Sequence, residues 1–233
     1  MDMPIATTTV QPATLAFLSS LAKHNEREWF QAHRAQYETA LANMRAFTDA
    51  LIAGMNGHDR IATADAKEAL LRIYTDQRFH KDRPPFKPRF AGRMDRVKPD
   101  LRGGYYFHIQ PGGSFIACGF YGPEAEDLRR IRMDILYDHG TWRKLLQAAA
   151  LRKTWGGLEG HQLKTAPRGF PKEHEALDLL RRTQFIFRQS FTDQEVLATG
   201  FLKEVNKSYQ AIRPWMDHMS AVLTTDGNGD PLA

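Results

Sequence analysis

Two short aromatic runs joined by a glycine-bearing turn constrain the fold more than any other feature of this chain. Residues 104–110 and 114–121 are rich in aromatic and β-branched side chains, and Pro111, Gly112 and Gly113 lie between them. Runs of this kind with a short connection containing glycine are typical of an antiparallel β-hairpin. We therefore expect a hairpin here, and any fold of the chain must place it in a sheet.

Further strands are expected on both sides of the hairpin. Apolar and polar positions alternate over residues 69–76, and residues 90–97 follow as a second strand after a loop that carries several prolines. Residues 184–189 have the composition of a late strand. With the two arms of the hairpin, the sequence predicts about five strands.

Helical periodicity dominates both ends of the chain. Apolar residues recur at intervals of three, four and seven along residues 26–55, where Asn25 has the spacing of an N-cap, and again along residues 201–222, which Pro214 should kink. Shorter helices are expected after Pro123, from Thr141 and near residues 172–182, and Thr192 with Glu195 has the spacing of a capping box. Because helices and strands fall in blocks without βαβ alternation, the expected fold is α+β, with a mostly antiparallel sheet packed against N- and C-terminal helices.

The chain is expected to form a single domain in the cytoplasm. Its 233 residues are 42% hydrophobic, and no linker interrupts residues 14–223, whereas residues 1–13 and 224–233 lack periodic apolar positions and are expected to be disordered. No apolar run approaches the roughly 20 residues that span a bilayer, and the first residues do not resemble a signal peptide. A single cysteine, Cys118, suits a reducing compartment and is expected to be a buried structural thiol.

Positive charge is concentrated in one part of the chain. Residues 72–102, called here the basic segment, carry ten Lys and Arg against four acids, a net charge of +6. The remaining 22 bases and 23 acids give −1, although the whole chain is +5. Localised charge focuses a field on whatever docks there, whereas evenly spread charge mainly aids solubility. The basic segment therefore permits an anionic partner without requiring one, because a solvated loop rich in lysine and arginine would carry the same charge.

Several motifs of the chain resemble one known family. The string R-I-Y-T-D-Q-R-F-H-K-D-R-P-P-F-K occupies residues 72–87, called here the motif, and N-E-R-E-W-F occupies residues 25–30. The supporting segments are G-Y-Y-F-H-I-Q-P-G-G-S-F at residues 104–115, G-G-L-E-G at 156–160 and P-R-G-F at 167–170. In this order, and covering nearly the whole chain, they resemble domain of unknown function 2461 (DUF2461). The resemblance implies a single cytosolic domain of unknown biochemistry. The family pattern has tyrosine at the position of Phe86 and threonine at that of Pro88, so a phenol at residue 86 cannot be essential chemistry in this chain.

The motif has the residue types of an anion-binding pocket. Arginine forks bind carboxylate or phosphate at two points, lysine adds a point charge, and aspartate orients cations or acts as a base. The candidate ligand-binding residues are Arg72, Tyr74, Arg78, Lys81, Asp82, Lys87 and Arg168, and the candidate catalytic residues are Asp76, His108 and Glu159. Alternation places Arg72, Tyr74 and Asp76 on one strand face. The same charges also suit an internal salt-bridge network that pins a long loop, and both interpretations stay open.

The candidates outside the motif have structural interpretations as well. His108 lies with Tyr106 and Gln110 on the polar face of the first hairpin strand, where it suits either acid–base chemistry or a packed, hydrogen-bonded role. Glu159 and Arg168 lie in two loops rich in glycine and proline, and plain turns with salt bridges explain them nearly as well.

The leading hypothesis is an enzyme or small-ligand binder for an anionic, phosphate- or carboxylate-bearing substrate. A nucleic-acid-binding module is the first alternative, with Phe79, Phe86 and Phe90 interleaved among basic residues, and a protein-interaction domain without catalysis is the second. The chain has no phosphate loop, dinucleotide fingerprint or zinc-ligand spacing, so neither a cofactor nor a metal site is expected. The reaction type and the oligomeric state are left open.

Overall fold

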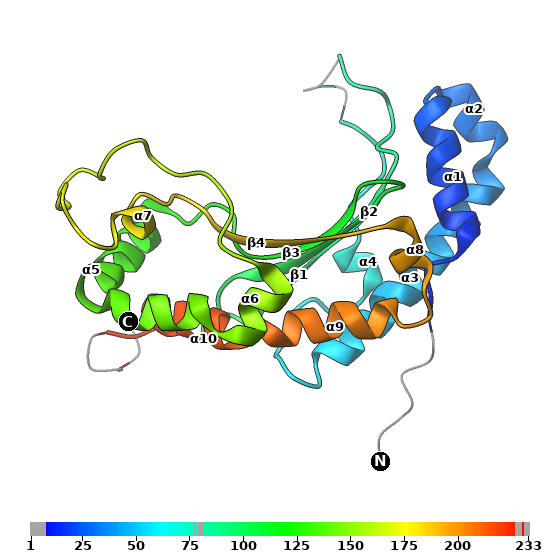
Figure 1. The fold of residues 1–233 in the computed structure, drawn as a ribbon. Helices are drawn as coiled ribbons and strands as arrows, with labels where there is room; N and C mark the ends of the chain where they lie inside the picture. The colour runs from blue at the N-terminus through cyan, green and yellow to red at the C-terminus, as the bar shows by residue number, and fades with distance from the viewer. Residues whose placement is uncertain (1–7, 77, 79–81, 227–229, 231–233) are drawn as a thin grey trace. The chain divides into compact units, whose positions relative to one another are not determined.

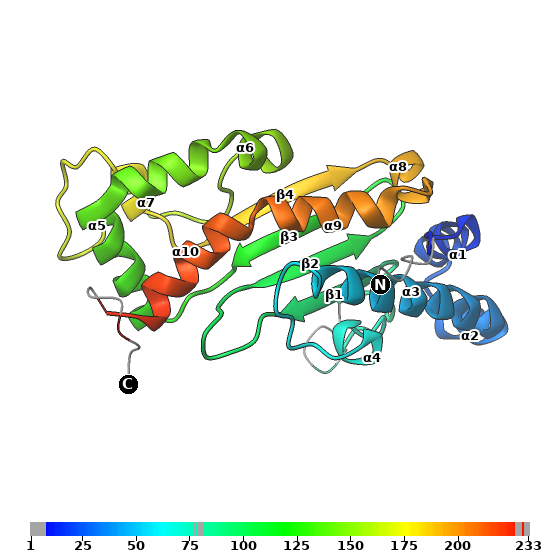
Figure 2. The ribbon, with the colours of Figure 1, turned by 90° about the horizontal axis from the view of Figure 1, so that it is seen from below.

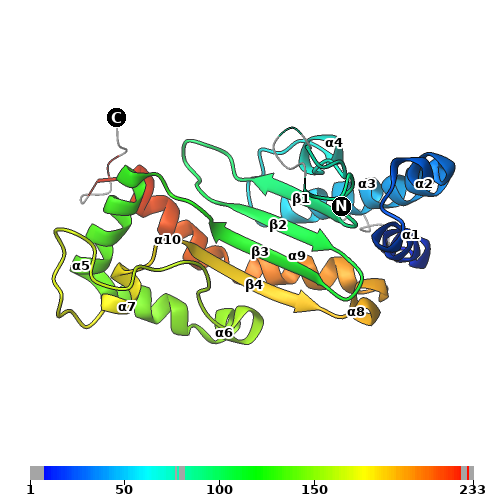
Figure 3. The ribbon, with the colours of Figure 1, turned by 90° about the horizontal axis from the view of Figure 1, so that it is seen from above.

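In the computed structural model, the described residues are 8–76, 78, 82–226 and 230. Within them the chain forms ten helices and one antiparallel sheet of four strands, which confirms the α+β fold class (Figure 1). The strands are β1 (Phe90–Asp95), β2 (Gly104–Ile109), β3 (Ser114–Phe120) and β4 (Phe185–Phe191), and they lie side by side in the order β1-β2-β3-β4 (Figure 3). Strands β2 and β3 are the predicted hairpin.

Along the described part of the sequence, four helices precede the first strand, three lie between β3 and β4, and three follow β4. They are α1 (Pro12–Lys23), α2 (Arg27–Ala32), α3 (Arg34–Met55), α4 (Ala66–Ala69), α5 (Ala125–Gln147), α6 (Ala149–Trp155), α7 (Leu177–Leu180), α8 (Asp193–Leu197), α9 (Phe201–Ala211) and α10 (Arg213–Thr224). No helix of the described part is long and apolar enough to cross a membrane.

The residues group into two compact units. Unit 1 comprises residues 1–94, 106–116 and 190–207, and unit 2 comprises residues 95–105, 117–189 and 208–233. The predicted boundaries of one domain at residues 14–223 stay a prediction.

In unit 1, helices cover one face of the strands. Phe107 of β2 meets Phe47 of α3 edge-on at 6.0 Å between ring centroids, and Phe47 also stacks on Phe201 of α9. Figure 2 shows α3 and the start of α9 on the same side of the strands. A Cβ at Gly92 of β1 would lie 2.4 Å from the Phe107 ring, so only glycine lets this ring lie against the backbone. Because side chains alternate along a strand, Tyr106 and His108 lie on the other face of β2.

In unit 2, large aromatic side chains form the core. Trp215 of α10 packs edge-on against Phe187 of β4 and Trp142 of α5, and all three are fully buried. Helix α5 has a kink at Asp138, whose carboxylate accepts a hydrogen bond from the Thr141 N–H at 3.2 Å. The predicted new helix at Thr141 is therefore the second half of a kinked helix.

The strand predicted at residues 69–76 is wrong. Ala69 ends α4, and the following residues form only two isolated antiparallel bridges, Leu70 with Gly92 and Tyr74 with Phe86. Alternation over residues 69–76 would put Leu71 on the apolar face with Ala69 and Ile73, but Leu71 is 48% exposed. The partner segment contains Pro84, Pro85 and Pro88, and proline cannot donate a ladder hydrogen bond, so the pairing cannot continue as a strand.

Two helix predictions also need correction. The helix expected over residues 26–55 is interrupted at His33, whose backbone is not helical, and its N-cap is Glu26 rather than Asn25. The helix expected near residues 172–182 shrinks to the single turn of α7, because Lys172–Glu175 offer no apolar stripe to bury.

Local signals at the C-terminal end are confirmed. Thr192 and Glu195 form a reciprocal capping box at the start of α8. The last amphipathic stretch breaks between α9 and α10 at Ile212, with Pro214 in the first turn of α10, where its missing N–H has no helical partner to lose.

Candidate functional site

Four charged residues at the front of the motif are exposed, and two of them form an ion pair with each other. They are Arg72, Asp76, Arg78 and Asp82. The Arg78 guanidinium donates to both carboxylate oxygens of Asp76, with Nε–Oδ1 at 3.0 Å and Nη2–Oδ2 at 2.8 Å, and the Arg78 N–H also donates to Oδ1. These hydrogen bonds raise the pKa of Arg78. The two side chains are 82% and 45% exposed, and exposed pairs of this kind contribute little to stability. Arg72 and Asp82 are also exposed, and Lys81 lies outside the described residues.

Aromatic packing anchors the motif to the N-terminal helices. Tyr74 packs against Phe30 of α2 and against Phe86, and Phe30 stacks on Phe86 at 4.1 Å between ring centroids. The Asn25 side chain donates to the Phe86 carbonyl and accepts from the Phe86 N–H, both at 3.0 Å. An amide clamp and three rings therefore hold this part of the motif. The sequence does not reveal the clamp, because Asn25 also has the spacing of an N-cap and Phe86 lies 61 residues away.

The aromatic side chains of the motif are poorly placed for stacking on nucleic-acid bases. Phe86 is 5% exposed and Phe90 is 3% exposed, and Phe90 stacks on Tyr37 of α3. Phe79 lies outside the described residues. Two of the three rings that the nucleic-acid hypothesis relied on are core residues.

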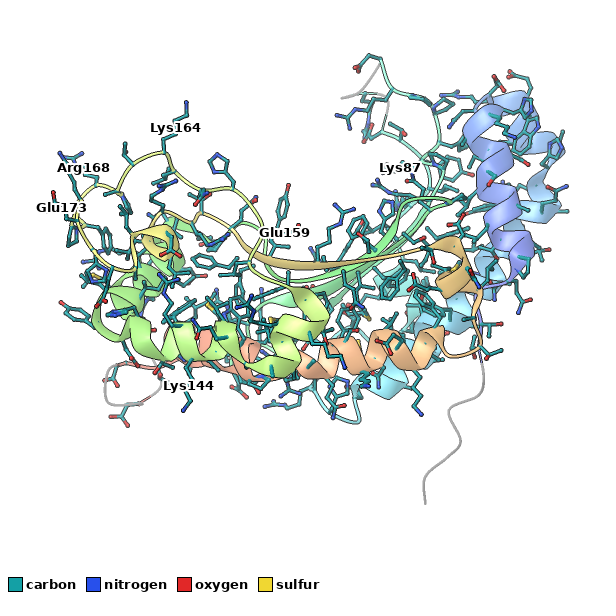
Figure 4. All side chains as sticks on the ribbon, in the orientation of Figure 1. Lys87, Lys144, Glu159, Lys164, Arg168 and Glu173 are labelled. Carbon is teal, nitrogen blue, oxygen red and sulfur yellow. The ribbon has the colours of Figure 1, made fainter. Side chains whose placement is uncertain are left out.

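Cations near the end of the motif are partly sheltered. Lys87 and Arg89 are both half-buried, and the Lys87 N–H donates to the Ile73 carbonyl at 2.7 Å (Figure 4). The charge of Arg89 reaches the Tyr106 phenol: burial raises the pKa of Tyr106, and Arg89 works in the opposite direction. Unit 1 therefore holds a half-buried cation, Arg89, whose charge acts on a half-buried phenol.

Tyr106, His108 and Gln110 form a hydrogen-bonded row, called here the polar row. The Tyr106 hydroxyl lies 3.2 Å from His108 Nδ1, and His108 Nε2 lies 3.0 Å from Gln110 Oε1. The Phe115 ring stacks on the imidazole at 4.6 Å between centroids, and His108 is only 6% exposed. The predicted sharing of one face by these three residues is confirmed. His108 itself is packed and hydrogen-bonded, and the two ends of the row, Tyr106 and Gln110, are both half-buried.

Glu159 and Arg168 belong to unit 2 and are exposed. The Glu159 N–H donates to the Ile186 carbonyl at 2.7 Å, and the Glu159 carbonyl accepts from Arg182 at 3.1 Å. The nearby glycine Gly160 has φ +99°, and a Cβ there would lie 2.7 Å from the Gln184 side chain. The glycine is thus explained by backbone geometry. In Figure 4 the Arg168 side chain points away from its loop.

Two arginines at the rear of the basic segment, the buried Arg96 and the half-buried Arg102, form ion pairs with acids outside the segment. The Arg96 side chain is fully buried in unit 2, where it donates to the Met216 carbonyl and Ser220 Oγ, both at 3.0 Å, and forms an ion pair with Asp217. Arg102 pairs with Asp127 of α5. These two arginines hold α10 and α5 in place, so their charge is not offered to a ligand.

A family model described as conserved hypothetical protein (DUF2461) matches residues 13–218, nearly the whole chain. The chain belongs to the DUF2461 family. The resemblance seen in the motifs is thereby confirmed. No curated protein and no solved structure matches the chain.

One open cavity of this DUF2461 protein lies apart from the predicted residues in sequence. It has a volume of about 380 Å³ and is lined by Gly112, Ser190, Phe191, Thr192, Asp193 and Glu195. Asp193 accepts from the Gly112 N–H at 2.8 Å, and Glu195 caps α8. Hydrogen bonds from the Thr192 N–H and hydroxyl lower the pKa of Glu195, which keeps it ionised. Two carboxylates at this cavity disfavour an anionic ligand there.

Metal ligands and thiol chemistry find no support in the described part of the DUF2461 chain. No three His, Cys, Asp or Glu side chains gather there in a way that would hold a metal ion. Cys118 is buried, as expected, and burial raises the pKa of its thiol well above the ordinary value. A thiol in that state is a poor nucleophile.

Proposed function

We propose that this DUF2461 protein is an enzyme or small-ligand binder for an anionic molecule bearing phosphate or carboxylate, with a basic pocket built on the motif and its continuation. The observation that supports it is the half-buried Arg89 near the end of the motif, whose charge opposes the rise that burial causes in the pKa of the half-buried Tyr106. A partly desolvated cation attracts an anion more strongly than an exposed one, because water screens it less. Lys87 adds a second half-buried positive charge.

The predicted site residues differ in the role that this proposal gives them. Arg72, Tyr74, Arg78 and Asp82 are exposed, so they are proposed as the rim of the pocket. Asp76 already accepts hydrogen bonds from Arg78 and is proposed to orient it. His108 is proposed to act through Tyr106, to which it is hydrogen-bonded.

Arg168 and Glu159 stay separate candidates in unit 2. A location in the cytoplasm, where the single thiol stays reduced, is part of the same proposal.

Thermal stability in the presence of simple anions tests the proposal. Purified protein is heated with inorganic phosphate, succinate or a short oligonucleotide, since binding to the native state raises its stability by mass action. We expect stabilisation by phosphate or succinate, a loss of about tenfold or more in affinity in Arg89→Gln, and a smaller loss in Arg89→Lys, which keeps the charge but not the fork. Arg78→Gln should lose less than Arg89→Gln.

Two results would contradict the proposal. One is the absence of stabilisation by either small anion. The other is stabilisation only by the oligonucleotide with a steep dependence on salt, which would favour the nucleic-acid alternative. The melting temperature of each variant without ligand shows whether it has folded.

A further inference from the structure

One tight turn joins Lys87 and Arg89. The Arg89 N–H donates to the Lys87 carbonyl at 2.7 Å, which closes a γ-turn centred on Pro88, a residue whose ring restricts the backbone. The Lys87 N–H donates in turn to the Ile73 carbonyl at 2.7 Å. Because the Cα atoms of Lys87 and Arg89 are two residues apart, they lie within about 7 Å of each other, and both side chains can reach one ligand group.

The two side chains of this turn carry charge that the described part of the protein leaves unpaired. Neither Lys87 nor Arg89 has a side-chain hydrogen bond or an ion pair with a described residue, and both are half-buried. Neither contributes to the buried nitrogen and oxygen atoms that lack a partner in this part of the chain, so both charged groups are open to water and to a ligand. At the front of the motif, in contrast, Arg78 pairs with Asp76. The turn therefore holds two positive charges for an anion to neutralise.

The turn offers a ligand charged side chains rather than backbone donors. Pro88 has no N–H, and the N–H groups of Lys87 and Arg89 already donate within the protein. An anion must therefore be held by the Lys87 ammonium group and the Arg89 guanidinium fork. The fork binds two oxygens of an anion, and the ammonium group can bind a third. A carboxylate has only two oxygens, whereas a phosphate monoester has three terminal oxygens and about 1.5 to 2 negative charges at neutral pH.

We propose that the turn selects molecules that end in a phosphate monoester over carboxylates and over phosphodiesters. Arg89 binds two phosphate oxygens, and Lys87 binds the third and neutralises the second negative charge. A phosphodiester has one negative charge, so it leaves one half-buried cation of the turn without a counter-charge. A dicarboxylate has two charges on separate groups, so it does not direct three oxygens at one point. This inference rests on the proposed function, because it names the substrate class of the same site.

Three small ligands test the selectivity. Methyl phosphate, dimethyl phosphate and succinate are titrated separately into the full chain at neutral pH and followed by calorimetry. We expect methyl phosphate to bind about tenfold more tightly than dimethyl phosphate, because it forms one more ion pair, and more tightly than succinate. Lys87→Gln should remove this preference by weakening methyl phosphate most, and Lys87→Arg should keep it. Arg78→Gln is the matched control outside the turn and should leave the preference unchanged.

The melting temperature without ligand is an independent readout. In the described part of the chain the Lys87 side chain has no partner to lose, and its close neighbour Arg89 has the same charge. Lys87→Gln should therefore not lower the melting temperature of the free protein. A clear drop would mean that the protein itself uses this charge, which would contradict the inference.

The outcomes separate this inference from the proposed function. Equal affinities for methyl phosphate and dimethyl phosphate, or binding of succinate at least as tight as that of methyl phosphate, would overturn the selectivity and leave anion binding standing. A preference for methyl phosphate that survives in Lys87→Gln would place the selectivity outside the turn and would also overturn the inference. No binding of any of the three ligands would overturn both the inference and the proposed function.

Discussion

The front and the rear of the basic segment are both rich in arginine, but their arginines differ in burial and in the sequence distance to their ion-pair partners. At the front, Arg78 pairs with Asp76, two residues away, and both side chains are in water. At the rear, Arg96 is fully buried and pairs with Asp217, which is 121 residues away in sequence. The net charge of the segment therefore overstates what it offers a ligand, because distant acids neutralise its rear and a neighbouring acid occupies its front.

The largest effect should come from the buried rear. Arg96→Met removes the ion pair with Asp217 and leaves the Met216 carbonyl without its guanidinium partner. The Arg96 side chain is fully buried whereas Asp217 is 45% exposed, so the loss comes mainly from the hydrogen bonds of the guanidinium. The free energy of unfolding should fall by about 3 kcal/mol, measured by urea denaturation. Arg96→Lys keeps the charge but not the fork and should recover only part of the loss. A change under about 1 kcal/mol in Arg96→Met would contradict the division of the segment.

The next effect tests whether an amide holds the motif. Asn25→Ala leaves the Phe86 N–H and carbonyl without their side-chain partners, which should cost about 1–3 kcal/mol in unfolding free energy. Asn25→Ser distinguishes the clamp from the N-cap that sequence spacing suggests, because serine caps a helix as well as asparagine does. Serine should therefore be as destabilising as alanine. A neutral Asn25→Ser variant would restore the N-cap role.

A smaller effect is expected from a pair of intermediate exposure in unit 2. Arg143 donates to Asp178 and lowers the pKa of that carboxylate. The stabilisation is fully present above the unfolded pKa of about 3.9 and is lost as pH falls through the lower folded value. Asp178→Asn should therefore cost under about 1 kcal/mol at neutral pH and less below about pH 4. Denaturant titrations across this range check it, and a difference that grows on acidification would contradict the assigned direction.

The smallest effect should come from the exposed front. Arg78→Ala removes a pair that water already screens, so the melting temperature should stay unchanged within error at physiological salt. A clear drop in melting temperature would show that the front of the motif is as structural as its rear.

Patterns that are complete within a few residues were predictable from the sequence. The hairpin of β2 and β3, the capping box of Thr192 and the shared face of the polar row each depend on neighbours in the chain. Alternation alone placed Tyr106 beside His108.

The sequence-based predictions are wrong or incomplete where a residue's structure depends on a segment that is distant in sequence. Residues 69–76 alternate like a strand, but the prolines of the partner segment prevent a continuous ladder. Asn25 has the spacing of a cap, but its amide is used 61 residues away at Phe86. The acids that neutralise Arg96 and Arg102 lie outside the basic segment, so counting charges inside it could not reveal them.

The most direct test of the account follows backbone amide shifts by NMR while labelled protein is titrated with inorganic phosphate. If residues 87–89, in the middle of the basic segment, bind the anion, the largest amide shift changes should fall at residues 87–89 and 106–110. The changes at residues 72–78 should be smaller. Largest shifts at residues 72–78, or in unit 2 with none at the polar row, would contradict it.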